Sequence, residues 1–214
     1  MNTGDYIDLY KKESIDIVNN VSSASIEQFI NLIYEAYTTE NTVYLAGNGG
    51  NAAYVQNFVV DLNMHPFVSE DKSSNSSIPR NLFKSVSLCS DPATISGISN
   101  DLGFNSIFKE QMKYQGIRND IFIGISGSGN SKNILEAMEF NSRKGIKNIL
   151  LTRNKENKCN EFADLTISVD GVSKFPGQTG GNNNNFHFED FISKLSHITV
   201  GILKLRVQQR IQNA

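Results

Sequence analysis

Apolar residues recur at helical spacing through the first forty residues of the chain. Between residues 26 and 38 they return every three or four positions, which predicts an amphipathic helix. Ser25 and Gln28 at its start have the chemistry of a capping box, so we expect Ser25 to be the N-cap. A weaker helical pattern precedes it, and we expect its apolar side to pack against a partner subunit. The apolar positions of the two patterns are Ile7, Tyr10, Ile15, Val18, Val21, Ile26, Phe29, Ile30 and Ile33.

Beyond Asn41 short apolar runs alternate with turns and helical stretches. This alternation is typical of βαβ units, which form a parallel sheet that is buried on both faces. A last, long helix is predicted from Phe186 to about Gln212. We therefore predict a single domain over residues 1–214, with N-terminal helices in residues 1–40 that contribute to oligomer packing and an α/β core in residues 41–214. The five apolar runs are Thr42–Ala46, Lys84–Leu88, Ile121–Ile125, Asn148–Thr152 and Leu165–Val169.

Two polar stretches interrupt this rhythm. Ser69–Asn81 and Gly171–Asn185 are rich in Gly, Ser or Asn, so we interpret each as a mobile loop. Within the second stretch, Asn182–Asn185 is interpreted as a flexible spacer. His187, which follows it, is interpreted as a residue at the start of the helix without a functional role.

Composition and charge exclude several classes of protein. The 20 Lys and Arg residues nearly balance the 22 Asp and Glu residues, and the net charge of −2 offers no broad positive surface for nucleic acid. The apolar runs are far shorter than the ~20 residues of a membrane helix, and we see no signal-type segment, so we expect a cytoplasmic protein. Cys89 and Cys159 lack metal-ligand spacing, and we expect two inert thiols.

Two of the strand-to-helix turns are built from small, hydrogen-bonding residues. Gly47–Asn51 follows the first predicted strand and Ser126–Ser131 follows the third. Small residues let backbone N–H groups approach an anion, the next helix presents unsatisfied donors, and serine hydroxyls add further donors. Together the turns predict a site for a phosphomonoester. No Gly-x-Gly-x-x-Gly motif and no P-loop Gly-Lys-Ser/Thr motif is present, so we expect no nucleotide cofactor.

Three segments, in matching order and spacing, resemble the sugar isomerase (SIS) domain proteins, and among them the phosphoheptose isomerase branch. These segments are Leu45–Ala53, Ser90-Asp91 with Ile98–Phe104, and Gly124–Ser131. The resemblance covers about residues 25–210. It implies a single SIS domain with a flavodoxin-like three-layer sandwich around a five-stranded parallel sheet. It also implies a homotetramer whose active sites are shared between subunits.

The function implied by this resemblance is the interconversion of sedoheptulose 7-phosphate and a glycero-manno-heptose 7-phosphate for surface-polysaccharide precursors, such as those of lipopolysaccharide or capsule. The implied substrate contacts all lie in the three segments, and we add Asn51 from the first turn. They are Asn48, Gly49, Gly50, Asn100, Asp101, Ser126, Gly127, Ser128 and Ser131.

Two polar stripes on apolar helices carry the candidate acid and base. Asp61 shares one helix face with Asn57 and His65, and His197 shares another with Glu189. Ketose–aldose isomerisation needs a base and an acid on opposite sides of an ene-diol. The resemblance implies that Asp61, at the position of a family glutamate, is the base and that His197 is the acid. It implies that Glu189, at the position of a family glutamine, contacts the sugar.

A metal site is an open alternative. In many members of the family these three positions bind zinc together with a histidine where this chain has Asn57. Asp61, Glu189 and His197 could still hold zinc or another divalent ion. The last two lie ~12 Å apart along their helix, so they can meet at one ion only through long, converging side chains or with help from another subunit. Alternatively, Asp61 and Glu189 bind sugar hydroxyls, which leaves His197 as the acid/base group. His65 replaces a family arginine, and we interpret it as a partner of the helix dipole.

These departures keep two other functions open. A SIS domain with relaxed catalytic demand could be a regulator that binds a sugar phosphate or another protein without turnover. Alternatively, the protein could be an isomerase for a different sugar phosphate, because His65 and Glu189 change the charge expected near the sugar. The sequence therefore defines the phosphate end of the predicted site better than the sugar end.

Overall fold

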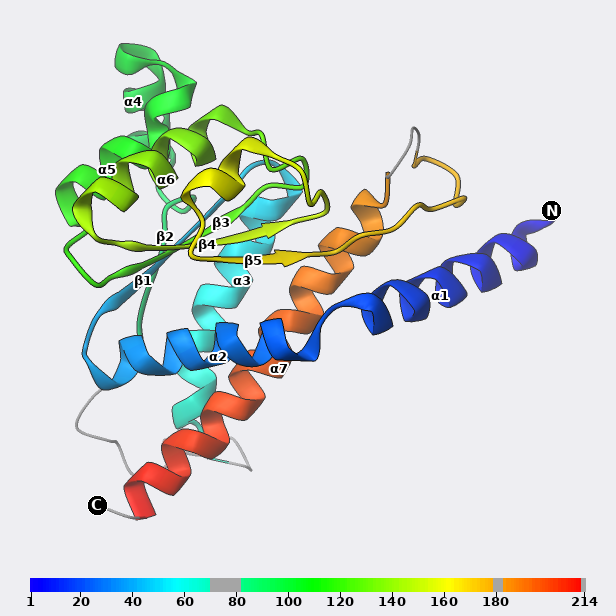
Figure 1. Ribbon diagram of the computed structural model, residues 1–214, viewed down its shortest axis with the longest axis horizontal. Coiled ribbons are helices and arrows are strands. Elements are labelled where there is room, and N and C mark those ends of the chain that lie inside the picture. Colours follow the sequence, from blue (N-terminus) through cyan, green and yellow to red (C-terminus); the bar gives the residue numbers. More distant parts are fainter. Residues whose placement is uncertain (70–81, 179–182, 213–214) are drawn as a thin grey trace.

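The fold is a three-layer α/β sandwich, seen in a computed structural model that describes residues 1–69, 82–178 and 183–212 (Figure 1). Most of the predicted loop Ser69–Asn81 and part of Gly171–Asn185 lie outside these residues. Five parallel strands form one sheet in the order β2-β1-β3-β4-β5, which is the flavodoxin-like order. The predicted five-stranded parallel sheet is confirmed. Its strands are β1 Thr42–Gly47, β2 Lys84–Ser87, β3 Ile121–Ile125, β4 Lys147–Thr152 and β5 Leu165–Ser168.

Helices cover both faces of the sheet. α2, α3 and α7 pack on one face, α5 and α6 pack on the other with α4 beyond them, and α1 extends away from the sheet (Figure 1). The long C-terminal helix predicted from the sequence is α7. Among the described residues, no helix combines the length and the apolarity needed to cross a bilayer. The helices are α1 Thr3–Asn20, α2 Ser23–Thr38, α3 Gly50–Met64, α4 Pro92–Leu102, α5 Ile107–Gln115, α6 Lys132–Lys144 and α7 Asn185–Gln212.

Alternating side chains of the strands supply two hydrophobic cores. In β1, Val43 and Leu45 join the core beneath α2, α3 and α7, whereas Tyr44 and Ala46 join the core beneath α5 and α6. Successive side chains of a strand point to opposite faces, so a strand buried on both faces reads as a continuous apolar run. This double burial explains why the strands were visible in the sequence.

The start of α2 corrects one prediction. Its N-cap is Ser22, whose hydroxyl oxygen accepts a hydrogen bond from the Ser25 backbone N–H at 3.3 Å, so Ser25 lies inside the helix. Neighbouring serines offer the same capping chemistry in two registers, and the apolar pattern alone did not distinguish them. In α1 only Ile17 is buried, and Ile7 and Ile15 remain exposed.

Candidate active site

The two predicted phosphate loops lie side by side at the carboxyl edge of the sheet. β1 pairs directly with β3, so the loops that follow these strands are neighbours. A reciprocal amide pair joins them: Asn48 Nδ2 donates to Asn133 Oδ1 at 2.9 Å, and Asn133 Nδ2 donates to Asn48 Oδ1 at 2.8 Å. The side chain of Asn48 therefore connects the first loop to α6.

The first loop ends at an uncapped helix. Gly49, the N-cap of α3, has φ +57°, a left-handed conformation that glycine adopts without a steric cost. It has no side chain, so no side-chain oxygen caps the first backbone N–H groups of α3. Gly50 and Asn51 open the helix. The Asn51 N–H donates to the Asn48 carbonyl at 3.1 Å and the Ala52 N–H to the Gly49 carbonyl at 3.0 Å. The Gly50 N–H is thus left as a helix-start donor of the kind that binds anions.

The second loop is held by its own hydroxyl groups. The Ser126 and Ser131 hydroxyl oxygens lie 2.9 Å apart, and the Ser128 hydroxyl accepts from the Asn130 backbone N–H at 3.2 Å. Gly129 has φ +63°, and a Cβ there would collide with the Asn157 side chain. Ser131 is the N-cap of α6 but makes no side-chain cap hydrogen bond. The Ile134 N–H instead donates to Asn133 Oδ1 at 3.0 Å, so the N–H groups of Lys132 and Asn133 are the donors without a side-chain cap at the start of α6.

The first turn of α7 spans the two loops. Asn185 Nδ2 donates to Glu189 Oε1 at 2.8 Å. A Cβ built on Gly50 would lie 3.1 Å from both carboxylate oxygens of Glu189, and one built on Gly127 would lie 3.3 Å from Asn185 Oδ1. The glycines thus leave room for this turn, and Glu189 brings a carboxylate to the first loop.

The asparagines before α7 are not a free spacer where the structure describes them. Asn184 is buried, and its Nδ2 donates to the Val169 carbonyl at 2.7 Å. Arg153 Nη1 donates to Asn183 Oδ1 at 2.7 Å. The flexible-spacer interpretation is therefore wrong for residues 183–185. Asn183 and Asn184 bond to the chain just after β4 and β5, and Asn185 bonds to Glu189 within α7. Residue 182 lies outside the described residues.

Packing of α3 against α7 brings Asp61 and His197 together. His197 Nε2 lies 3.7 Å from Asp61 Oδ2, and His65 Nε2 lies 3.5 Å from Asp61 Oδ1. Asn57 Nδ2 also donates to Asp61 Oδ2, at 3.0 Å. The Asp61 side chain is 13% exposed and that of His197 is 67% exposed. The carboxylate is thus held between polar neighbours, and the imidazole of His197 remains open to a ligand.

Within one chain Asp61 and His197 form a carboxylate–imidazole pair, because His197 Nε2 lies 3.7 Å from Asp61 Oδ2. A base and an acid on opposite sides of an ene-diol would need about 7 Å between them, with two contacts of roughly 3.5 Å each. The resemblance implies active sites that are shared between subunits, so the role of each residue stays a prediction.

His65 is the C-cap of α3 and faces the last turn of that helix. This place matches the predicted role as a partner of the helix dipole. Its contact with Asp61 agrees with the predicted helix face that the two residues share, because they are four positions apart.

The proposed metal ligands are not gathered at one point. Glu189 lies beside Gly50, two helical turns from His197, and Asn57 turns its amide nitrogen rather than its oxygen toward Asp61. Among the residues that the structure describes, no three His, Cys, Asp or Glu side chains form a group that could hold a metal ion. The residues present do not fit the zinc set of the family.

Asn100 and Asp101 are exposed on α4, where Asn100 Nδ2 donates to Asp101 Oδ1 at 2.8 Å. No residue of α4 is buried, and the helix packs against α5 and the short 3-10 turn Phe104–Ser106. In the described part of the chain, the bond that these two side chains make is with each other, so their predicted contact with the substrate stays a prediction.

A buried cluster around His187 was missed by the sequence analysis. His187 Nε2 lies 3.2 Å from Glu13 Oε2, and the His187 ring lies 4.3 Å from the Tyr10 ring, centre to centre. Burial alone would raise the pKa of Glu13, but hydrogen bonds from Ser173, the Lys174 N–H and His187 outweigh it and lower that pKa. The cluster ties α1 to the start of α7. The predicted place of His187 at the start of the helix is confirmed, and its buried contacts give it a structural role that was not predicted.

A second group missed by the sequence analysis is the guanidinium of Arg153. The Arg153 backbone N–H donates to the Gly127 carbonyl at 3.1 Å, and Arg153 Nε lies 3.1 Å from the position of a Cβ on Gly127. Arg153 is the first residue after β4, which pairs with β3. That position at the end of a strand is the signal that could have found it.

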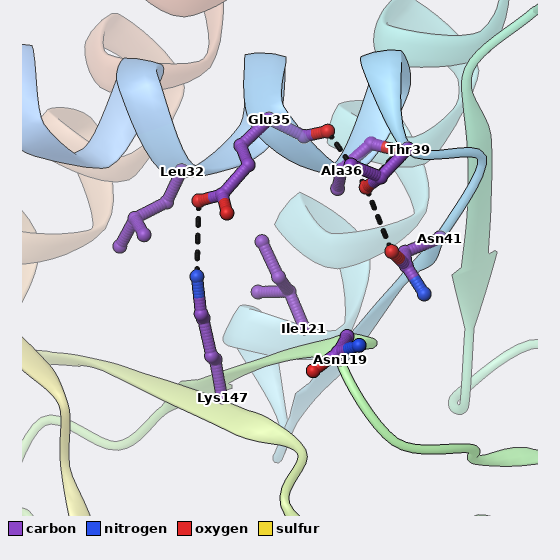
Figure 2. A pocket seen from close by; sticks show the side chains of 8 residues that line it. All are labelled: Leu32, Glu35, Ala36, Thr39, Asn41, Asn119, Ile121 and Lys147. Carbon is purple, nitrogen blue, oxygen red and sulfur yellow. Dashed lines mark hydrogen bonds and ion pairs between the residues drawn. The ribbon is translucent and has the colours of Figure 1, made fainter.

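A pocket of about 390 Å³ lies at the opposite edge of the sheet (Figure 2). It opens between α2 and the amino ends of β1, β3 and β4, and none of the predicted site residues lines it. A Glu35–Lys147 ion pair of 2.9 Å crosses it. Its lining residues are Leu32, Glu35, Ala36, Thr39, Asn41, Asn119, Ile121 and Lys147.

Comparison with known proteins adds the following matches. Residues 9–153 match the family described as SIS domain. Phosphoheptose isomerase 2 of Campylobacter jejuni is 36% identical over 154 residues, which are 72% of this chain and 69% of that protein. Phosphoheptose isomerase of Aneurinibacillus thermoaerophilus is 34% identical over 170 residues, which are 77% and 81% of the two chains.

Solved structures show the same fold. Phosphoheptose isomerase GmhA from Neisseria gonorrhoeae superposes with a TM-score of 0.77 at 21% identity, over 94% of this chain and 98% of that one. A phosphoheptose isomerase from Francisella tularensis gives a TM-score of 0.77 at 24% identity, over 96% and 100% of the two chains. At these identities the likeness establishes the fold.

Proposed function

The chain belongs to the SIS domain family, and from that premise we propose that it interconverts a phosphorylated ketose and an aldose, with sedoheptulose 7-phosphate as the ketose. Relatives that are 36% and 34% identical carry the name phosphoheptose isomerase. The observation that carries the proposal is the Asp61–His197 pair on helices that both begin at the phosphate loops. This pair supports an acid/base role toward a ligand that is bound by its phosphate.

In the proposed mechanism His197 moves the proton between carbons. Nε2 faces Asp61, so a proton on Nε2 points toward the carboxylate and Nδ1 carries the lone pair. Nδ1 takes the proton from the carbon beside the carbonyl and returns it to the former carbonyl carbon of the ene-diol. A second proton passes between the two ene-diol oxygens. Asp61 orients the ring and stabilises the imidazolium that forms.

The remaining site residues bind the substrate in this proposal. Ser126, Ser128 and Ser131 of the second loop hold the phosphate together with the start of α6. The Glu189 carboxylate at the first loop repels a phosphate there and accepts hydrogen bonds from sugar hydroxyls. The substrate then lies with its phosphate at the second loop and its polyol along α3 and α7. The other proposed contacts are Asn48, Gly49, Gly50, Asn51 and Gly127.

We further propose a homo-oligomer, and specifically a tetramer. α4 has no buried residue, and exposed apolar side chains on α1 and near α4 are suited to a second copy of the chain. Asn100 and Asp101 would then contribute to the site of a neighbouring subunit. Sedimentation of the purified protein tests this, and a monomer at micromolar concentration would contradict it. A cytoplasmic location and a role in surface-polysaccharide precursors belong to the same proposal.

Turnover of sedoheptulose 7-phosphate tests the function. The purified protein is expected to form the aldose phosphate, detected by chromatography, and the variant H197N is expected to form almost none. Other C5–C7 ketose phosphates serve as comparison substrates. Binding of sedoheptulose 7-phosphate without turnover would replace the isomerase proposal with a regulatory one, and turnover of a different ketose alone would replace the substrate.

A further inference from the structure

A guanidinium lies against the second phosphate loop. Arg153 follows β4, and its backbone N–H donates to the Gly127 carbonyl at 3.1 Å, which fixes the main chain beside the loop. The same carbonyl accepts from Thr152 Oγ1 at 3.3 Å. The Nε of Arg153 is buried and lies 3.1 Å from the position of a Cβ on Gly127. Only a glycine leaves this space to the arginine.

The charges at the two loops have opposite signs. Glu189 stands at the first loop, where both of its oxygens face Gly50, and Arg153 stands at the second. A phosphate dianion is therefore repelled from the first loop and attracted to the second. The serine hydroxyls and the start of α6 provide neutral donors there, and the arginine adds the net positive charge that they lack.

We infer that Arg153 is a further substrate-binding residue, which holds the phosphate of a phosphomonoester at the Ser126–Ser131 loop and so sets the direction in which the sugar lies. This inference rests on the proposed function and assigns one of its binding groups. A planar guanidinium suits a phosphate because its N–H groups match the spacing of the phosphate oxygens.

A purely structural role is the competing explanation. Arg153 Nη1 donates to Asn183 Oδ1 at 2.7 Å, and this bond helps to place the residues that lead into α7. If that were the whole role, the N183A variant would reproduce the loss caused by removing the arginine. The two roles therefore differ in what happens to the affinity for phosphate itself.

The test compares R153Q, R153K and N183A with a matched control, K155Q. Lys155 carries the same charge two residues later, but its side chain is 77% exposed and pairs with Asp170 at 2.6 Å. For each protein the KM and kcat for sedoheptulose 7-phosphate and the inhibition constant of inorganic phosphate are measured. R153Q is expected to raise the KM and the phosphate inhibition constant together, by about 10- to 100-fold, with a smaller change in kcat. R153K recovers part of the loss, and K155Q and N183A leave phosphate inhibition close to wild type.

Several results would overturn the inference. Phosphate inhibition that is unchanged in R153Q, or lost equally in N183A, would make Arg153 a structural residue. If R153Q does not fold, R153K provides the test, because lysine keeps the charge but replaces the planar set of guanidinium donors with an ammonium. A phosphate inhibition constant that is unchanged in R153K would overturn the inference. The wild type is measured first. An inactive wild type would contradict the proposed function, whereas an active wild type with an R153Q variant equal to it contradicts this inference alone.

Discussion

The two edges of the sheet differ in the polar groups that they present. At the amino edge the Asp120 carboxylate accepts from the Thr42 N–H at 2.9 Å and the Ile117 N–H at 2.8 Å, and Glu35 pairs with Lys147. At the carboxyl edge the helices α3 and α6 begin without side-chain caps. The amino edge also carries the pocket of Figure 2. A cavity alone therefore does not identify the site. Polar groups hold the fold at both edges, as Asp120 does at the amino edge and the Asn48–Asn133 pair does at the carboxyl edge. The start of α3 without a side-chain cap and the exposed His197 lie outside the amino edge.

Removal of the His197 imidazole is expected to have the largest effect. H197N should lower kcat by about 10²- to 10⁴-fold, the usual contribution of a positioned acid/base group. The melting temperature should change little, because the side chain is 67% exposed. S193A, one turn earlier on α7, is the control. A kcat in H197N close to that of wild type would contradict the assignment of the active site to the carboxyl edge, because the exposed imidazole would then have no chemical role.

At the amino edge the corresponding change should affect stability and not catalysis. D120N replaces a buried carboxylate that accepts two backbone N–H bonds with an amide that turns an N–H group toward one of them. The free energy of unfolding should fall by about 2–3 kcal/mol. Urea denaturation measures this loss, and steady-state kinetics on the folded fraction should match wild type. A raised KM with unchanged stability would place substrate at the wrong edge.

Acidification should remove the stability that the hydrogen-bonded carboxylate of Glu13 contributes. The pKa of Glu13 lies below its ordinary value of 4.5, because hydrogen bonds outweigh the effect of burial. Its contribution to stability is therefore complete above pH 4.5 and is lost as the pH falls through the lowered pKa. At pH 7, E13Q should cost about 1–3 kcal/mol of unfolding free energy, and the gap should narrow as the pH falls. A gap independent of pH would mean that Glu13 contributes by packing alone.

The smallest effect is expected in the pocket itself. K147Q removes the ion pair between Lys147 and Glu35, whose side chains are 37% and 55% exposed, respectively. The free energy of unfolding should fall by less than about 1 kcal/mol. The kinetic constants for the sugar phosphate should not change. Thermal melts and initial rates measure both quantities. A loss of substrate affinity in K147Q would reverse the assignment of the two edges.

The sequence predicted the sheet well because its signal is local. The central strands β1 and β3 are apolar almost throughout, since both faces of the sheet are buried there. The nine residues of α5 were not predicted, because Ile107, Phe108 and Met112 form too short a pattern to recognise as a helix. The N-cap of α2 was misplaced because Ser22 and Ser25 have the same capping chemistry.

The candidate site was only partly predictable. Small residues at strand ends marked both loops, and helix periodicity placed Asp61 on one face of α3. The approach of His197 to Asp61 depends on how α3 packs against α7, and the approach of Arg153 to Gly127 depends on the strand order. His187 meets Glu13 across 174 positions of sequence. Such contacts follow from tertiary packing, which local patterns do not encode.

A crystal structure with bound sedoheptulose 7-phosphate tests the central claim most directly. We predict the phosphate within hydrogen-bonding distance of the Ser126–Ser131 loop, with the carbonyl end of the sugar near His197 Nδ1. The pocket beside Lys147 should hold no sugar. A phosphate bound beside Lys147, or a sugar whose carbonyl end lies away from His197, would contradict the account.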